Sequence, residues 1–321
     1  MHYFITGVAG FIGSRLADSL LAQGAHVTGV DDLSLGRLAN LDSARRHGAF
    51  DFLELDMSRP ANAVRALRWS TELFGVPDIA WHMAANSDIA AGSADATRDF
   101  NRTLETTFAL LEAGRAEGLK RLAFASTSAV YGNRQEHLAE DSGPLLPISN
   151  YGAAKLASEA LISAAAESFL ERIWIFRFPN VVGPRATHGV IFDLLARLAA
   201  SPPSLRVLGD GTQTKPYLHV DELIDAMRFI VERAGERRNV YNIGPEGAGT
   251  SVKFIAEAVV ERAAPGTPLA YTGGDRGWVG DVPRFQYSTE RLARLGWKPR
   301  LSSDQAILRA IEELAPAAVA R

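Results

Sequence analysis

The chain has 321 residues, of which 47% are hydrophobic and 22% charged, a composition typical of one large α/β unit or of a domain with a smaller companion. Its net charge of −3 and scattered basic residues lack the clustered positive field that nucleic acid or an anionic membrane needs in a partner. The absence of cysteine excludes disulfides and thiolate catalysis, and the isolated histidines argue against a metal site. No stretch approaches the ~18 apolar residues of a membrane span, and no basic leader precedes the first apolar run. We therefore expect a cytoplasmic protein.

Short apolar runs alternate with helix-length segments through the first half of the chain. The runs are bounded by Gly, Asp and Ser, a pattern typical of parallel strands joined by crossover helices. The expected strands are Tyr3–Thr6, His26–Val30, Phe50–Leu55, Ile79–Met83, Arg121–Ala125 and Ile173–Phe178. The expected helices are Phe11–Gln23, Pro60–Phe74, Thr97–Glu117 and Tyr151–Ser168. This alternation predicts an α/β fold with a Rossmann-like, doubly wound parallel sheet.

Turn residues crowd the chain after about Asn180, in segments such as "GPRATHG", "SPPS" and "GGDRGWVGDVP". They predict a smaller, loop-rich domain that binds substrate. Residues 217–243 again have the pattern of a helix followed by a strand, which could rejoin the sheet. We therefore expect a first domain of residues 1–179, rejoined by about 217–244, and a second domain of residues 180–216 and 245–321.

Three glycines lie between the first expected strand and the first expected helix, in "FITGVAGFIGS". Gly7 suits a tight turn, Gly10 the close approach of the backbone to a pyrophosphate, and Gly13 the packing of the helix against the sheet. Amides at the helix start, those of Phe11 and Ile12 among them, would face the phosphates at the positive end of the helix dipole. The loop predicts a dinucleotide site.

An acidic pair, Asp31 and Asp32, ends the second expected strand, where a ribose-binding carboxylate is expected after such a loop. The Asp31 carboxylate would bond two ribose hydroxyls and repel a 2′-phosphate. NAD is therefore favoured over NADP as the cofactor.

The candidate reacting centre combines "STS", at the end of the strand near residue 125, with "YGAAK" at the start of a helix. Tyr151 and Lys155 are four residues apart, so a helix places them on one face. The pKa of the phenol must fall from about 10 for it to act as a base, and a positive charge roughly 4 Å away, at an effective dielectric of about 20, is worth nearly three pK units. Lys155 and an oxidised nicotinamide are both candidates for that charge, and a hydroxyl such as that of Thr127 could donate to a developing alkoxide or carbonyl.

The motifs "GVAGFIGS", "STSAVYG" and "YGAAK" together resemble the extended short-chain dehydrogenase/reductase superfamily. "FRFPNVVGPR", "LGDGTQTKPYLHVDEL" and "RGWVGDV" resemble its NAD-dependent nucleotide-sugar epimerases, of the UDP-glucose 4-epimerase type. The resemblance implies Tyr151 as the catalytic base, Lys155 as the residue that binds the nicotinamide ribose and lowers the pKa of Tyr151, and Thr127 as the hydroxyl partner. It further implies that NAD takes hydride from C4 of a UDP-hexose, that the 4-keto sugar turns, and that hydride returns to its other face. The resemblance also implies a homodimer, in which the helices that start at Thr97 and Tyr151 would pair across a two-fold axis.

The same resemblance implies further contacts. Those to NAD are Asp56, Met57, Ala84, Ala85 and Phe178, and those to the nucleotide sugar are Asn180, Leu194, Lys215, Tyr217 and Arg276. Two positions depart from the family pattern. Thr103 stands where the family has an asparagine, and Lys215 precedes Pro216 where an arginine and an aspartate are common. The bulky Phe285 lies near the position at which the family admits or excludes an N-acetyl group, and it favours plain hexoses.

Other activities of the same superfamily are the main alternatives. A 4,6-dehydratase is disfavoured because its Asp-Glu pair after the threonine is here Ser128 and Ala129. A 4-ketosugar reductase or a decarboxylase stays open, and redox balance distinguishes them, because an epimerase retains its NAD and needs none added. A non-catalytic NAD-binding regulator is a remote alternative, since Tyr151, Lys155 and Thr127 are all present.

Overall fold

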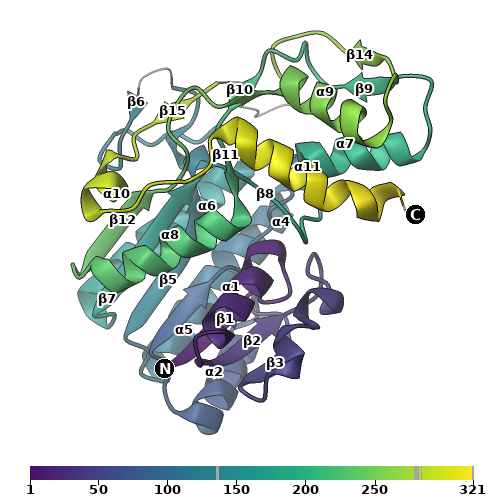
Figure 1. The fold of residues 1–321 in the computed structure, drawn as a ribbon. Coiled ribbons are helices and arrows are strands. Elements are labelled where there is room, and N and C mark those ends of the chain that lie inside the picture. Colours follow the sequence, from purple (N-terminus) through teal and green to yellow (C-terminus); the bar gives the residue numbers. More distant parts are fainter. Residues whose placement is uncertain (135–136, 278–281, 283, 320–321) are drawn as a thin grey trace.

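Figure 1 shows the protein as a computed structural model, which describes residues 1–134, 137–277, 282 and 284–319. A seven-stranded sheet has the strand order β12-β7-β5-β4-β1-β2-β3, and all neighbouring strands are parallel. The strands are β1 (His2–Thr6), β2 (His26–Asp31), β3 (Phe50–Glu54), β4 (Ile79–His82), β5 (Arg121–Thr127), β7 (Arg172–Phe178) and β12 (Arg238–Asn242). The order reverses between β1 and β4, where ligands bind in open α/β sheets. The prediction of a doubly wound parallel sheet is confirmed.

Helices cover both faces of this sheet. On one face α1 and α8 pack together over a core that includes Leu16, Leu20 and Met227. On the other face α2, α5 and α6 enclose a second core around Leu67, Leu110 and Ile162. The bounds are α1 (Phe11–Leu21), α2 (Pro60–Phe74), α5 (Thr106–Ala116), α6 (Asn150–Ser168) and α8 (Val220–Arg233).

The expected helix Thr97–Glu117 is interrupted by one widened turn. The helix runs as α4 (Ala96–Asp99), then the π-helical segment Phe100–Glu105, and then α5. The hydroxyl of Thr106 donates to the carbonyl of Asn101, five residues back, at 3.2 Å. Thr103 lies buried inside the π segment, and its hydroxyl accepts a hydrogen bond from the Asn86 N–H at 3.1 Å. Such bulges are frequent at functional sites, and this one lies beside the cavity described below, which Arg102 and Thr106 help to line.

The second lobe, in the upper part of Figure 1, is built from α7, α9 and α11 around a separate apolar core. Its helices are α7 (Val190–Ala199), α9 (Val252–Ala263) and α11 (Ser303–Val319). Its two-stranded pairs are formed by β8 (Asn180–Val182) with β11 (Tyr217–His219), β9 (Leu205–Val207) with β14 (Leu269–Tyr271), and β10 (Thr214–Lys215) with β13 (Thr250–Ser251). Within residues 217–243, β11 therefore pairs outside the central sheet, while β12 extends that sheet beside β7.

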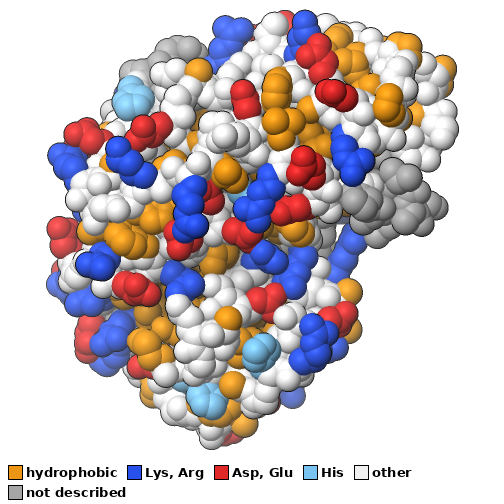
Figure 2. Space-filling model, in the orientation of Figure 1, with side chains coloured by type: hydrophobic (Ala, Val, Ile, Leu, Met, Phe, Trp, Pro, Cys, Tyr) orange, Lys and Arg blue, Asp and Glu red, His pale blue; other side chains and the backbone are white. Residues whose placement is uncertain are grey.

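Shorter elements complete the fold. They are α3 (Ile89–Ala94), α10 (Glu290–Leu295), the pair β6 (His137–Leu138) and β15 (Gln286–Tyr287), and the 3₁₀ turns Leu38–Leu41, Ala44–Arg46 and Ser128–Tyr131. On the face drawn in Figure 2, blue and red side chains alternate and no large area has a single sign. Among the described residues, no helix is long and apolar enough to cross a membrane, and no group of three potential metal ligands occurs.

Candidate active site

One cavity of about 660 Å³ lies between the carboxyl ends of the central strands and the second lobe. Its walls include Gly7 after β1, Asp31 at the end of β2, Ala84 after β4 and Thr127 at the end of β5. The second lobe contributes Leu194 and other residues. The predicted residues that line it are Gly7, Gly10, Phe11, Ile12, Gly13, Asp31, Asp32, Asp56, Met57, Ala84, Ala85, Thr127, Tyr151, Lys155, Phe178, Asn180, Leu194, Lys215 and Tyr217. Residues predicted from separate motifs thus meet in a single cavity.

The glycine loop has the backbone geometry that a pyrophosphate requires. Gly7 has a φ of +70°, and a Cβ there would lie 2.7 Å from the Ala84 nitrogen. A Cβ on Gly13 would collide with the Gly7 carbonyl, so only glycine lets α1 approach the loop this closely. Among the described residues no side chain caps α1, whose first residues, Phe11 and Ile12, line the cavity. First-turn N–H groups without a side-chain cap suit an anion such as a dinucleotide pyrophosphate.

Asp31 is held rigidly beside this loop. Its two carboxylate oxygens accept hydrogen bonds from the N–H groups of Ala9 and Leu33, each at 2.9 Å. Burial raises the pKa of Asp31, and these N–H bonds oppose that rise. A Cβ on Gly36 would lie 2.7 Å from one of its oxygens, so a glycine is needed there as well. Asp32 is exposed and also lines the cavity, so both acids lie where the ribose of a dinucleotide is expected.

Helix α6 carries the two central residues of the site. Its N-cap residue, Ser149, accepts a hydrogen bond from the Gly152 N–H at 3.1 Å, which fixes the start of the helix beside Tyr151. The Thr127 hydroxyl lies close enough to the Tyr151 phenol to lower its pKa. The Lys155 ammonium is buried, donates to the Ala125 carbonyl at 2.5 Å and lies 4.6 Å from the centre of the Phe124 ring. Tyr151 and Lys155 therefore both face the end of β5.

The electrostatics of these residues differ from the expectation. Desolvation raises the pKa of Tyr151 to about 12; the nearby Thr127 hydroxyl lowers it, and the Asp99 charge raises it further. Desolvation lowers the pKa of Lys155 to about 7, although the negative charges of Glu159 and Asp99 raise it. The expected lowering of the Tyr151 pKa is not seen, because desolvation of the buried phenol outweighs the effects that oppose it. Further positive charge is needed before Tyr151 can act as a base near neutral pH.

Asp99 is a charged residue of the site that sequence reasoning missed. It is 1% exposed and accepts a hydrogen bond from the Asn86 side-chain amide at 2.8 Å. Its charge acts on both Tyr151 and Lys155. In the sequence Asp99 has the pattern of an ordinary acid on a helix surface. No sequence pattern indicated the π segment that directly follows it. The cavity-lining loop of residues 186–189 was missed in the same way.

All the residues predicted to hold the nucleotide sugar except Arg276 line the cavity, on the side of the second lobe. Tyr217 is 4% exposed, and its N–H donates to the Ser303 hydroxyl at 2.8 Å. Phe285 lines the cavity and stacks on Tyr287, with ring centres 5.7 Å apart. Arg276 is exposed and, unlike its neighbour Gly277, is not among the described residues that line the cavity. Its contact with substrate stays a prediction, as do the roles of the rest of "RGWVGDV", of which residues 278–281 lie outside the described part.

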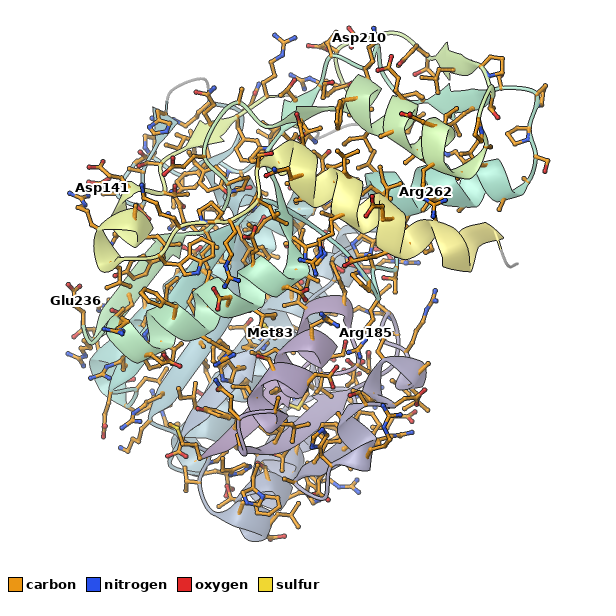
Figure 3. All side chains as sticks on the ribbon, in the orientation of Figure 1. Met83, Asp141, Arg185, Asp210, Glu236 and Arg262 are labelled. Carbon is orange, nitrogen blue, oxygen red and sulfur yellow. The ribbon has the colours of Figure 1, made fainter. Side chains whose placement is uncertain are left out.

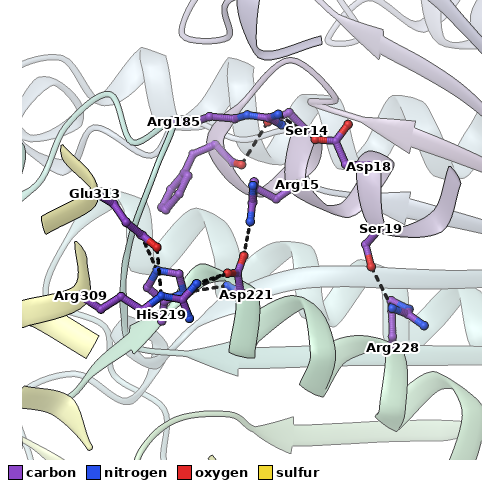
Figure 4. A network of polar contacts seen from close by, with 11 residues as sticks. Ser14, Arg15, Asp18, Ser19, Arg185, His219, Asp221, Arg228, Arg309 and Glu313 are labelled. Carbon is purple, nitrogen blue, oxygen red and sulfur yellow. Dashed lines mark hydrogen bonds and ion pairs between the residues drawn. The ribbon is translucent and has the colours of Figure 1, made fainter. Parts of the chain in front are cut away.

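Ion pairs join the two lobes beside the cavity. Asp221, at the start of α8, binds Arg15 of α1 and, at 2.6 Å, Arg309 of α11, as Figure 4 shows. Glu313 of α11 lies 2.9 Å from His219 in the same network. Arg185, which Figure 3 places beside α1, binds Asp18 at 2.7 Å just before the cavity-lining loop. The helix that follows the glycine loop is thereby tied to the second lobe.

The sheet, the glycine loop and the Tyr151–Lys155 pair define a dinucleotide-dependent enzyme of the Rossmann type. Residues 3–244 match the model of the NAD dependent epimerase/dehydratase family. The chain belongs to this family, and its cofactor is NAD.

Named relatives agree with this assignment. The chain is 29% identical to a UDP-glucose 4-epimerase of Mycolicibacterium smegmatis, over 97% of this chain and 98% of that protein. A crystal structure of a UDP-galactose 4-epimerase is 31% identical, with a TM-score of 0.85 over 99% of each chain. The UDP-glucose 4-epimerase of Thermus thermophilus, solved with NAD, is 28% identical, with a TM-score of 0.84 over 98% of each chain.

Proposed function

We propose that this protein interconverts the C4 epimers of a nucleotide-activated hexose of the UDP-glucose/UDP-galactose type, by transient oxidation at C4. The observation that carries the proposal is the cavity whose lining brings Tyr151, Lys155 and Thr127 together with the glycine loop. Relatives that are similar over nearly their full length include a UDP-glucose 4-epimerase and a UDP-galactose 4-epimerase. The expected second domain, residues 180–216 and 245–321, would hold the nucleotide.

The chain's own residues account for the proton transfer. The Tyr151 phenolate would accept the proton of the C4 hydroxyl, and the Thr127 hydroxyl would steady the same oxygen. Lys155, whose pKa of about 7 leaves it partly charged near neutrality, would hold the nicotinamide ribose. When bound, NAD supplies the hydride acceptor, and its oxidised ring adds a positive charge. A unit charge about 4 Å away, at an effective dielectric of about 20, lowers a phenol pKa by nearly three units.

The alternatives in the superfamily predict different residues or a different redox balance. Ser128 and Ala129 line the cavity after Thr127, and neither supplies the acid and base that elimination needs. A 4-ketosugar reductase would consume added reduced cofactor, and a decarboxylase would release carbon dioxide. A non-catalytic NAD-binding regulator would turn over nothing.

The decisive experiment is to incubate the purified protein with a panel of UDP- and dTDP-hexoses without added NAD and to resolve the products by NMR. We expect conversion between 4-epimers, with NAD retained by the protein. A requirement for added cofactor, or a product that is not a 4-epimer, would overturn the proposal.

Phe285 supports plain hexoses over N-acetylated sugars as substrates, because its ring occupies part of the cavity wall. A Phe285→Ala variant should raise kcat/KM for UDP-N-acetylglucosamine relative to UDP-glucose by about tenfold, the effect of space gained in an apolar pocket. Equal turnover of the two sugars by the wild type would contradict this role. Asn180→Ala on the same wall tests for a general effect, since it should weaken both sugars alike.

Three finer assignments belong to the proposal. A homodimer through α5 and α6 is supported by Phe100, 51% exposed, and Phe108, 50% exposed, near the start of that pair. Light scattering at micromolar concentration tests the homodimer, and a monomer would contradict it.

A place in galactose metabolism follows only if UDP-galactose is a good substrate in the panel. Residence in the cytoplasm stays a prediction.

A further inference from the structure

A buried acid lies directly behind the catalytic pair. Glu159 follows Lys155 by four residues on α6, so Tyr151, Lys155 and Glu159 share one face of the helix. The Glu159 side chain is 7% exposed and forms a two-pronged ion pair with Arg177 of β7, at 3.0 and 2.7 Å. A buried acid paired in this way is costly to place in a core, and the proton transfer described above makes no use of it.

The contacts of this ion pair bracket Thr127. The Ser126 hydroxyl, directly before Thr127 on β5, donates to Glu159. Beyond Thr127, Arg177 donates to the Tyr131 hydroxyl at 3.1 Å, at the end of the turn that Thr127 opens. Thr127 is therefore held on both sides by one buried pair.

Three successive turns of α6 each contribute one contact to the end of β5. Tyr151 lies close to the Thr127 hydroxyl, Lys155 donates to the Ala125 carbonyl, and Glu159 accepts a hydrogen bond from Ser126. A shift of the helix along the strand would break all three contacts together. Bidentate charge-assisted bonds fix geometry better than single hydrogen bonds do, so the Glu159–Arg177 pair is the contact that resists such a shift most strongly.

We propose that Glu159 is a positioning residue of the reaction: through Ser126 and Arg177 it fixes the register of α6 on β5 and so aligns Tyr151 with Thr127. The inference rests on the proposed epimerase function. It adds an electrostatic role, because the Glu159 charge favours the protonated form of Lys155, whose pKa burial lowers to about 7. Loss of this carboxylate therefore affects both the alignment of the pair and the charge of Lys155.

The main test removes both charges of the pair, because loss of Glu159 alone strands a buried arginine. The double variant Glu159→Leu/Arg177→Met should fold and keep its NAD, while kcat falls about 100-fold, the typical effect of a misplacement of about 1 Å. KM for the nucleotide sugar should change little, because the second lobe is untouched. Ser126→Ala, which leaves the ion pair in place, should lower kcat by about tenfold through the same loss of alignment.

The single variant Glu159→Gln adds a pH readout. It removes a charge that supports the Lys155 ammonium, so the alkaline limb of the kcat profile should begin at lower pH than in the wild type. The matched control is Glu167→Gln on the same helix, an exposed acid paired with Arg238, which should change neither kcat nor its pH profile.

Wild-type kcat in the folded, NAD-containing double variant would overturn the proposal. If that variant does not fold, wild-type kcat in Ser126→Ala would overturn it instead. An inactive wild-type protein in the same assay would show that the proposed function is wrong, which separates that failure from a failure of the role of Glu159.

Discussion

The two lobes of this protein place their functional residues by different means. In the sheet lobe, strands of four to seven residues end at one edge, and all of them except β12 bring their following residue to the cavity. In the second lobe, strands of two or three residues pair across long stretches of chain, as Thr214 does with Ser251 and Leu205 with Leu269. Site residues of the first lobe follow from strand ends, whereas those of the second depend on which distant segments meet.

The difference extends to how tightly the residues are held. Lys155 and Asp31 are each fixed by hydrogen bonds to a neighbouring strand or loop. On the second-lobe wall, Phe285 is held by stacking on Tyr287. We infer that chemistry belongs to the first lobe and choice of sugar to the second, and the following variants examine that division.

Tyr151→Phe should have the largest effect, because it removes the proposed base and leaves the glycine loop intact. We expect kcat to fall about 10³-fold, within the range of general base catalysis, while the protein retains its NAD. Turnover of UDP-galactose and the NAD released on denaturation are the two measurements. Tyr271→Phe, on an exposed strand of the second lobe, is the control and should be active. Near-normal kcat in Tyr151→Phe would remove the central residue of the proposal.

Gly13→Ala should disturb the first lobe through its backbone. Its Cβ would meet the Gly7 carbonyl, so the loop or α1 has to shift. We expect loss of bound NAD and a fall in the free energy of unfolding of about 2 kcal/mol, typical of overpacking. Gly48→Ala is the matched control, since a Cβ there meets no described atom within 4 Å. Retention of NAD by Gly13→Ala would show that close packing of this loop is not required.

Much of the first lobe could be predicted because its signals are local. The apolar runs, the glycine spacing around Gly10 and the four-residue interval from Tyr151 to Lys155 each fit within one strand, turn or helix. The central sheet and the family are confirmed, whereas the individual site roles and the domain bounds stay predictions.

The rest depends on contacts between segments distant in the sequence. Asp99 becomes part of the site only because it is buried against Asn86, ahead of the π turn. Arg185, with a φ of +74°, is placed by its ion pair with Asp18. The direction of the Tyr151 pKa shift was also beyond the sequence, since it depends on how deeply α6 is desolvated.

His82 should make the first lobe sensitive to acid. Its Nδ1 lies 2.7 Å from the Thr6 hydroxyl and its Nε2 2.9 Å from the Thr107 hydroxyl, and burial lowers its pKa to about 3. The unfolded chain takes up a proton below about pH 6.5 that the folded chain does not, so stability falls as the pH drops from about 6.5 towards 3. The loss at pH 5 should be on the order of 2 kcal/mol.

Urea unfolding at pH 7.5 and pH 5 measures this loss. His82→Gln, which cannot titrate, should be less stable at pH 7.5 but lose less on acidification than the wild type. His47→Gln, on the surface, should follow the wild-type curve. An unchanged difference between the two pH values in His82→Gln would exclude His82 as the cause.

Asp221→Asn examines the link between the lobes and should have the smallest effect. The variant weakens the contacts to Arg15 and Arg309, which are partly exposed, so we expect a loss of roughly 1 kcal/mol in the free energy of unfolding. If the ion pairs set the position of the second lobe on α1, KM for the nucleotide sugar should rise by about threefold, which corresponds to under about 1 kcal/mol of binding. NAD content and kcat should stay constant, because the glycine loop and α6 do not touch Asp221.

Glu257→Gln, which breaks an exposed pair with Lys253 inside the second lobe, is the control and should change none of these quantities. A fall in kcat without a change in KM would place Asp221 with the chemistry and would contradict the division between the lobes.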